Sequence, residues 1–278
     1  MDTKLIAQLA GYFIIVNVLG LMVGHYLIQQ DVQPTIINDN PNDVVNSFGL
    51  LGYMLVGTIV ILAAIKFFPD KVLYWFLKGL EAMALLFSTI IVMIAFFPEA
   101  YALFLAMVII VVRIFFPQYL IWRNVSSTLA TVGVGALLGA SIGVWPVIVF
   151  LIMLGVYDYI AVFQTKHMVT MAKAVAKKNL SFTFALPTSK HQFELGTGDL
   201  VMPLVFSVAV LGESLQNGWV WPYATIPSFA ILLASFAGLA FTLDYGSKNI
   251  GKALPALPLQ VGLMIIMYGI LHASGLFA

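Results

Sequence analysis

The stretch Leu195-Gly196-Thr197-Gly198-Asp199-Leu200 places a carboxylate at the start of a long apolar run that continues to Leu215. A second carboxylate, Asp158, lies inside an earlier apolar run, in the sequence Val156-Tyr157-Asp158-Tyr159-Ile160. An ionisable side chain in a segment of hydrocarbon length is costly unless it has a partner or a function. Two such acids in neighbouring segments therefore indicate a functional site.

The composition is that of a membrane protein. Of the 278 residues, 62% are hydrophobic and 9% are charged, whereas about 25% of the residues in a soluble domain are charged. We therefore expect an all-α polytopic membrane protein. The net charge of +1 gives no basic surface for nucleic acid. The chain has no cysteine, and its four histidines show no metal-ligand spacing, so we expect neither a metal nor a cofactor.

Nine apolar segments are long enough to be read as membrane-spanning helices, each of which needs about 20 residues. The first segment is too long for the core of a signal peptide, and no small-residue cleavage site follows it. We expect residues 1–143 to form a scaffold of five helices and residues 144–278 to form a catalytic half of four, within one membrane domain. The nine segments are 6–28, 48–67, 73–96, 101–116, 125–142, 144–163, 198–215, 221–243 and 257–277.

The basic residues predict the orientation. With nine crossings, all 13 Lys and Arg residues fall at the N-terminus or in alternate connections on the same side. The remaining connections carry Asp31, Asp39, Asp43 and Glu99 but no Lys or Arg. Since cytoplasmic loops are enriched in Lys and Arg, we expect the N-terminus to be cytoplasmic and the C-terminus external.

The two acids are predicted at similar depth near the cytoplasmic side. Asp158 precedes Lys166 by eight residues, and Asp199 follows Lys190 by nine. At about 1.5 Å per helical residue, each acid lies roughly 12 Å or less inside the boundary. The sixth and seventh helices run in opposite directions, so the acids lie on antiparallel neighbours in the sequence. Whether the two side chains face each other is left open.

Two carboxylates in contact favour one ionised and one protonated group. The ionised group can take a proton from water while the protonated group polarises a carbonyl, which is hydrolysis without a metal or a covalent intermediate. Paired membrane acids also serve proton-coupled transporters, and a cation leak or a prepilin-peptidase-like enzyme are further alternatives. A transporter built from internal repeats would show pseudo-symmetry, and none is visible.

Two further stretches fit a hydrolytic site. Gly196 and Gly198 flank Thr197 and allow irregular backbone, which is tolerated at membrane depth where it lines a water-filled cavity. In the segment 253–258, two prolines three residues apart prevent a regular helix. Its backbone groups are then available to pair with another chain, at the level of the two acids.

Together, the motifs Tyr157-Asp158, Gly196-Thr197-Gly198-Asp199 and Pro255-Ala256-Leu257 resemble the YD, GxGD and PAL motifs of presenilins and signal peptide peptidases, the GxGD intramembrane aspartyl proteases. The predicted orientation is similar to that of presenilins, and the compact chain resembles a microbial presenilin homologue. The resemblance implies that Asp158 and Asp199 are the catalytic pair, supported by Tyr157, Gly196, Thr197 and Gly198. It also implies that Pro255, Ala256 and Leu257 contact the substrate, a single membrane-spanning helix unwound before cleavage. Nothing in the sequence requires partner subunits, and the oligomeric state is left open.

Local patterns give further expectations. Residues 181–186 alternate as a strand would, so they form either a strand with an unpaired edge or an ordered loop. We hypothesise that an unwound substrate adds to that edge by β-augmentation. Residues 168–175 have the spacing of an interfacial helix. The repeat Gly135-x3-Gly139-x3-Gly143 predicts close helix packing, and Lys78 with Glu81 predicts an ion pair that reaches the membrane interface.

Overall fold

A computed structural model describes residues 3–32, 34–116, 118–161, 183–187, 192–248 and 255–275. These residues form nine α-helices, one short 3₁₀ helix and a two-stranded sheet, so the expected all-α membrane fold is confirmed. The elements are α1 (Thr3–Gln29), α2 (Val45–Phe67), α3 (Asp70–Ile94), α4 (Glu99–Phe115), α5 (Leu120–Ser141), α6 (Val144–Ile160), β1 (Thr183–Pro187), β2 (Gln192–Gly196), α8 (Gly198–Gln216), η2 (Tyr223–Thr225), α9 (Ile226–Lys248) and α10 (Leu257–Ala273).

Each expected membrane segment corresponds to one α-helix. Five spans in the described chain, formed by α1, α2, α3, α8 and η2 with α9, are long and apolar enough to cross a membrane. Helices α6 and α10 are shorter but apolar. The eighth segment differs most from expectation, because α9 begins at Ile226 rather than at 221. Residues 223–225 before it form the 3₁₀ turn instead.

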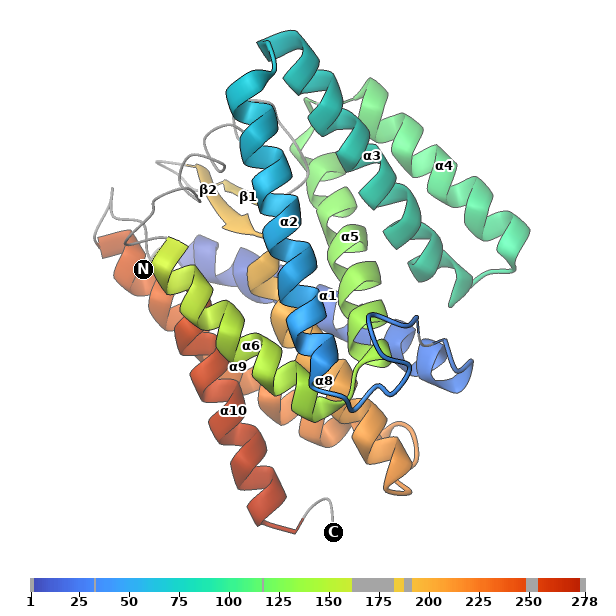
Figure 1. Cartoon of the computed structure of the whole chain (residues 1–278), viewed down its shortest axis with the longest axis vertical. Coiled ribbons are helices and arrows are strands. Elements are labelled where there is room, and N and C mark those ends of the chain that lie inside the picture. Colours follow the sequence, from blue (N-terminus) through green and yellow to red (C-terminus); the bar gives the residue numbers. More distant parts are fainter. Residues whose placement is uncertain are drawn as a thin grey trace.

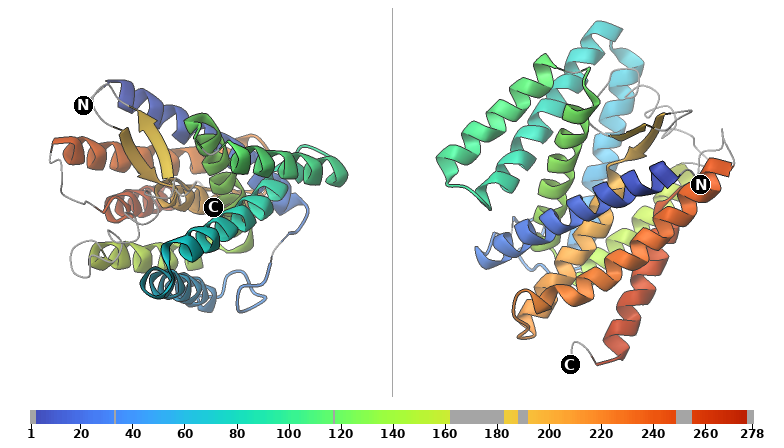
Figure 2. Two further views of the ribbon diagram at one scale, coloured as in Figure 1. Left: turned by 90° about the horizontal axis from the view of Figure 1, so that it is seen from above. Right: turned by 180° about the vertical axis from the view of Figure 1, so that it is seen from behind.

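Helices α5 and α8 occupy the centre of the bundle (Figures 1 and 2). Helix α5 packs against α1, α3 and α8, and it buries Asn124, Ser127 and Thr131 among other polar side chains. Polar groups inside a membrane protein are favoured where they face protein rather than lipid. The central position of α5 therefore explains why a spanning helix carries so many of them.

Glycines allow the central helices to approach closely. A Cβ atom added at Gly139 would lie 2.6 Å from the backbone oxygen of Val205 on α8, and one at Gly135 would meet the side chain of Leu204. The predicted packing role is therefore confirmed for these two residues. Gly143 is different, because α5 ends at Ser141 and Gly143 is the residue before α6.

An ion cluster joins α3 to α4, which lie together on one flank of the bundle (Figure 1). The ammonium of Lys78 lies 2.6 Å from the Glu81 carboxylate, which confirms the predicted pair. The guanidinium of Arg113 lies 3.1 Å from the same carboxylate. Glu81 is 3% exposed and Arg113 is 1% exposed. The expectation that Glu81 reaches the interface is wrong, because the second cation from α4 balances its charge inside the protein.

The hairpin before α8 confirms the predicted strand and adds a second strand that pairs with it. Strands β1 and β2 are antiparallel, with Ala185 opposite Glu194. Strand β2 pairs with one edge of β1, so the expected edge without a neighbouring strand is the other edge of β1. Residues 181–182 of the predicted strand and the predicted interfacial helix over 168–175 lie outside the described residues.

Candidate active site

Asp158 lies near the end of α6 and is buried. Its side chain is 5% exposed, so its polar atoms need partners from the protein. The backbone N–H of Leu257 donates a hydrogen bond to the Asp158 carboxylate. Leu257 is the first residue of α10, where backbone N–H groups have no acceptor within the helix. The proline-containing segment thus meets the first acid directly.

Asp199 lies in the first turn of α8. The chain reaches it from β2 through Thr197, the residue before the helix. The partial positive charge of a helix N-terminus favours a carboxylate at this position. Asp158 is near enough for its charge to act on Asp199. The structure therefore brings together the two acids that the sequence placed at similar depth.

Helix α10 contacts both sides of this site. Leu257 is buried against Phe150 and Leu154 of α6. One turn later, the amide nitrogen of Gln260 donates to the backbone oxygen of Asp199 at 3.3 Å. Sequence reasoning missed Gln260, although a polar side chain in an apolar helix was a usable signal. The start of α10 fixes the positions of α6 and α8 relative to each other.

The glycines next to Asp199 do not have the backbone conformation that only glycine favours. Among the described residues, the glycines with positive φ are Gly218 and Gly275. A Cβ atom at Gly196 would lie 3.5 Å from Oδ2 of Asp199, and one at Gly198 would meet nothing within 4 Å. The expected irregular backbone is the junction between β2 and α8. A Cβ atom at Gly196 would thus make only an ordinary contact with the carboxylate.

Comparison with known proteins identifies the family and the fold. Residues 10–273 match the family described as signal-peptide peptidase, presenilin aspartyl protease. The chain belongs to this family. A presenilin family intramembrane aspartate protease crystallised in space group C222 is similar over 97% of this chain and 99% of that chain, with a TM-score of 0.71 and 22% identity. A presenilin family intramembrane aspartate protease in space group P2 is similar over 95% of this chain and 97% of that chain, with a TM-score of 0.65 and 22% identity. No curated protein matches the sequence.

In this aspartyl protease family member, the hairpin is held against α5 by side chains. The amide of Ala185 donates to Oδ1 of Asn124 at 2.9 Å, and Nδ2 of Asn124 donates to the oxygen of Ala185 at 2.9 Å. Ser127 donates to the oxygen of Thr183 at 3.2 Å. Asn124 therefore bonds the outer edge of β1 as a neighbouring strand would. No pattern in the sequence indicated this contact.

An ion pair adds to the same contact, with its guanidinium buried and its carboxylate partly exposed. The guanidinium of Arg123 lies 3.0 Å from the carboxylate of Glu194 on β2, and it also donates to the hydroxyl of Thr183 on β1. Arg123 is 4% exposed. The sequence placed it at the membrane boundary, whereas the structure uses it to join α5 to both strands.

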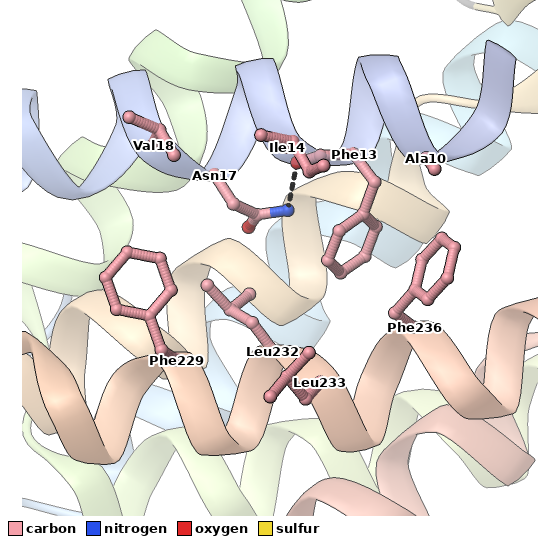
Figure 3. A pocket seen from close by; sticks show the side chains of 9 residues that line it. All are labelled: Ala10, Phe13, Ile14, Asn17, Val18, Phe229, Leu232, Leu233 and Phe236. Carbon is pink, nitrogen blue, oxygen red and sulfur yellow. Dashed lines mark hydrogen bonds between the residues drawn. The ribbon is translucent and has the colours of Figure 1, made fainter. Parts of the chain in front are cut away.

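A separate apolar pocket of about 220 Å³ lies between α1 and α9 of the protease (Figure 3). Its lining includes Asn17, whose amide nitrogen donates to the oxygen of Phe13 one turn earlier at 2.8 Å. The carboxamide oxygen of Asn17 has no hydrogen-bond partner within the described chain. No titratable side chain lines the pocket, so it offers no acid or base for hydrolysis.

Proposed function

We propose that this family member hydrolyses peptide bonds within single membrane-spanning helices, with Asp158 and Asp199 as the catalytic pair of a GxGD-type site. The observation that carries the proposal is that α6 and α8 bring two carboxylates together inside the bundle, with the start of α10 bonded to one of them. Its family and the presenilin-like fold agree with this chemistry.

The reaction needs one protonated and one ionised carboxyl group, a state that two adjacent acids favour. The ionised group takes a proton from water as the water oxygen bonds to the scissile carbonyl carbon. The protonated group gives its proton to the carbonyl oxygen, which yields a tetrahedral diol. The acid that took the water proton then gives it to the amide nitrogen, while the other, now ionised, acid takes a proton from a diol hydroxyl. The C–N bond breaks, and a carboxylic acid and an amine leave.

The neighbouring residues have supporting roles in this proposal. Leu257 orients Asp158 through its backbone N–H, and Pro255 and Ala256 precede it at the place where substrate is expected. Gly196, Thr197 and Gly198 form the turn that presents Asp199, and Tyr157 precedes Asp158 on α6. The active site lies near the cytoplasmic side if the predicted orientation holds.

The β-augmentation hypothesis is now restricted to one strand of the hairpin. Asn124 already bonds Ala185 on the outer edge of β1, so an unwound substrate would have to pair along β2. That strand leads through Thr197 into α8, which would deliver an extended segment next to Asp199. Backbone pairing of this kind binds many sequences, because it uses main-chain groups.

The decisive experiment measures cleavage of a single-span reporter by the purified protein in liposomes. We expect the native chain to cut within the span, and Asp158→Asn and Asp199→Asn each to abolish cutting, because two groups that act as one unit fail together. Glu99→Asn, which changes an exposed acid at the start of α4, is the matched control and should cut normally. Normal cleavage by either Asp variant would refute the catalytic pair and favour the transporter alternative.

A further inference from the structure

At the end of α8 opposite Asp199, Glu213 lines a cavity of about 310 Å³. Glu213 follows Asp199 by 14 positions, or roughly 21 Å along the helix, so this cavity is separate from the catalytic pair. Both carboxylate oxygens of Glu213 lie 3.0 Å from the hydroxyl of Tyr268. One hydroxyl supplies one hydrogen, whereas a carboxylate has about four lone-pair positions. Glu213 therefore keeps acceptor capacity toward the cavity.

The other residues that line the cavity also favour a ligand with hydrogen-bond donors or a positive charge. The residues with amide side chains that line the cavity are Asn42, Gln216 and Asn217, and no Lys or Arg lines it. Gly212 leaves room beside Glu213, because a Cβ atom there would meet a single neighbour, the Ile28 side chain at 3.7 Å. The cavity is thus a space with oxygen acceptors and one carboxylate.

The C-terminal ends of helices strengthen the negative electrostatic potential in the cavity. Residues from the last turn of α1, the last turn of α5 and the last turn of α8 all line the cavity. None of these three last turns contains a basic residue. Each helix C-terminus carries about half a negative charge. One helix, α6, begins at the cavity and opposes this effect, so three negative ends and a carboxylate face one positive end.

Two ring side chains complete the surroundings. Trp145 lines the cavity and is 60% exposed at the end of the bundle, where tryptophan is typical of the membrane interface. An aromatic face also attracts cations. His272 on α10 is near enough to act electrostatically on Glu213, and it does not line the cavity. Trp145 and the residues with amide side chains therefore share the cavity with Glu213.

We propose that this cavity binds a primary ammonium group. An ammonium carries one positive charge and three donors, which match one carboxylate and the neighbouring amide oxygens. The group has two sources at this depth, the ethanolamine headgroup of a phospholipid and a small soluble alkylamine. The proposal is independent of the catalytic pair.

The test uses the full-length protein in nanodiscs of phosphatidylethanolamine mixed with phosphatidylglycerol, followed by native mass spectrometry of the lipid that stays bound. Glu213→Gln removes the charge while keeping an acceptor for Tyr268, and Gly212→Leu fills the cavity while keeping the charge. Glu99→Gln is the control acid. A second arm adds ethanolamine in phosphate buffer to protein in phosphatidylglycerol alone and records thermal unfolding against equal ionic strength of KCl.

Retention of phosphatidylethanolamine by the native chain and Glu99→Gln, with at least a tenfold loss in both cavity variants, would support the lipid source. No retained lipid, but a rise in unfolding temperature with ethanolamine that Glu213→Gln lacks, would support the soluble source. Equal results for native and cavity variants in both arms would overturn the proposal. Equal stabilisation by KCl and ethanolamine would also overturn it, since the site would then not select an ammonium group.

Discussion

Asn17 and Asn124 are both buried asparagines in membrane helices, yet their hydrogen bonds differ. Asn17 bonds its own helix, and its carboxamide oxygen is unpaired among the described residues. Asn124 bonds both backbone groups of Ala185. A buried backbone group that loses its partner costs about 1–3 kcal/mol. The contribution of each asparagine to stability therefore depends on the hydrogen-bond partners of its carboxamide. The residue type alone does not reveal these partners.

We expect Asn124→Leu to lower the thermal stability and to slow cleavage, because Ala185 loses its partners and the hairpin loses its contact with α5. Asn17→Leu should leave both quantities unchanged or raise the stability, because it replaces an unpaired oxygen in an apolar pocket. Thermal unfolding in detergent and reporter cleavage in liposomes measure the two effects. Equal unfolding temperatures and equal cleavage rates for the two variants would contradict the role assigned to Asn124.

At the scale of elements, α5 and α8 pack at a distance that their glycines set. We expect Gly139→Ala to lower stability by about 1–3 kcal/mol, the usual range for an overpacked core, since the added methyl would lie 2.6 Å from a backbone oxygen. Gly57→Ala in α2 is the matched control. Its methyl would meet nothing within 4 Å, and alanine favours helix over glycine by about 1 kcal/mol.

Thermal unfolding of both glycine variants in the same detergent checks this prediction. Gly57→Ala should be unchanged or more stable, and Gly139→Ala should be less stable. If Gly139→Ala unfolded at the native temperature, α5 and α8 would have room to separate. The close packing would then not be what holds the two central helices.

For the whole molecule, the predicted orientation is open to direct test. Helix α1 begins beside the start of α10, and α10 runs away from that point to its own end (Figures 1 and 2), as an odd number of crossings requires. A reporter enzyme that works only outside the cytoplasm should be active when fused after residue 278 and inactive when fused before residue 1. The reverse pattern would overturn the orientation, and with it the cytoplasmic position proposed for the active site.

The sequence by itself determined the nine membrane helices and the two acids, because hydrophobic length and the cost of a charge in lipid are local properties. It also gave the strand at 183–186 and the pair of Lys78 with Glu81. The predicted helix ends are less accurate where a turn precedes the helix, as before α9.

Only the tertiary structure decided which side chains meet. The bond from Leu257 to Asp158, the contact of Asn124 with Ala185 and the second cation at Glu81 each join residues far apart in the chain. They depend on how each helix is rotated about its axis. A helix such as α2 has no continuous polar stripe along one side that would indicate its buried face. Close packing against neighbouring helices fixes that rotation, and the sequence pattern does not contain it.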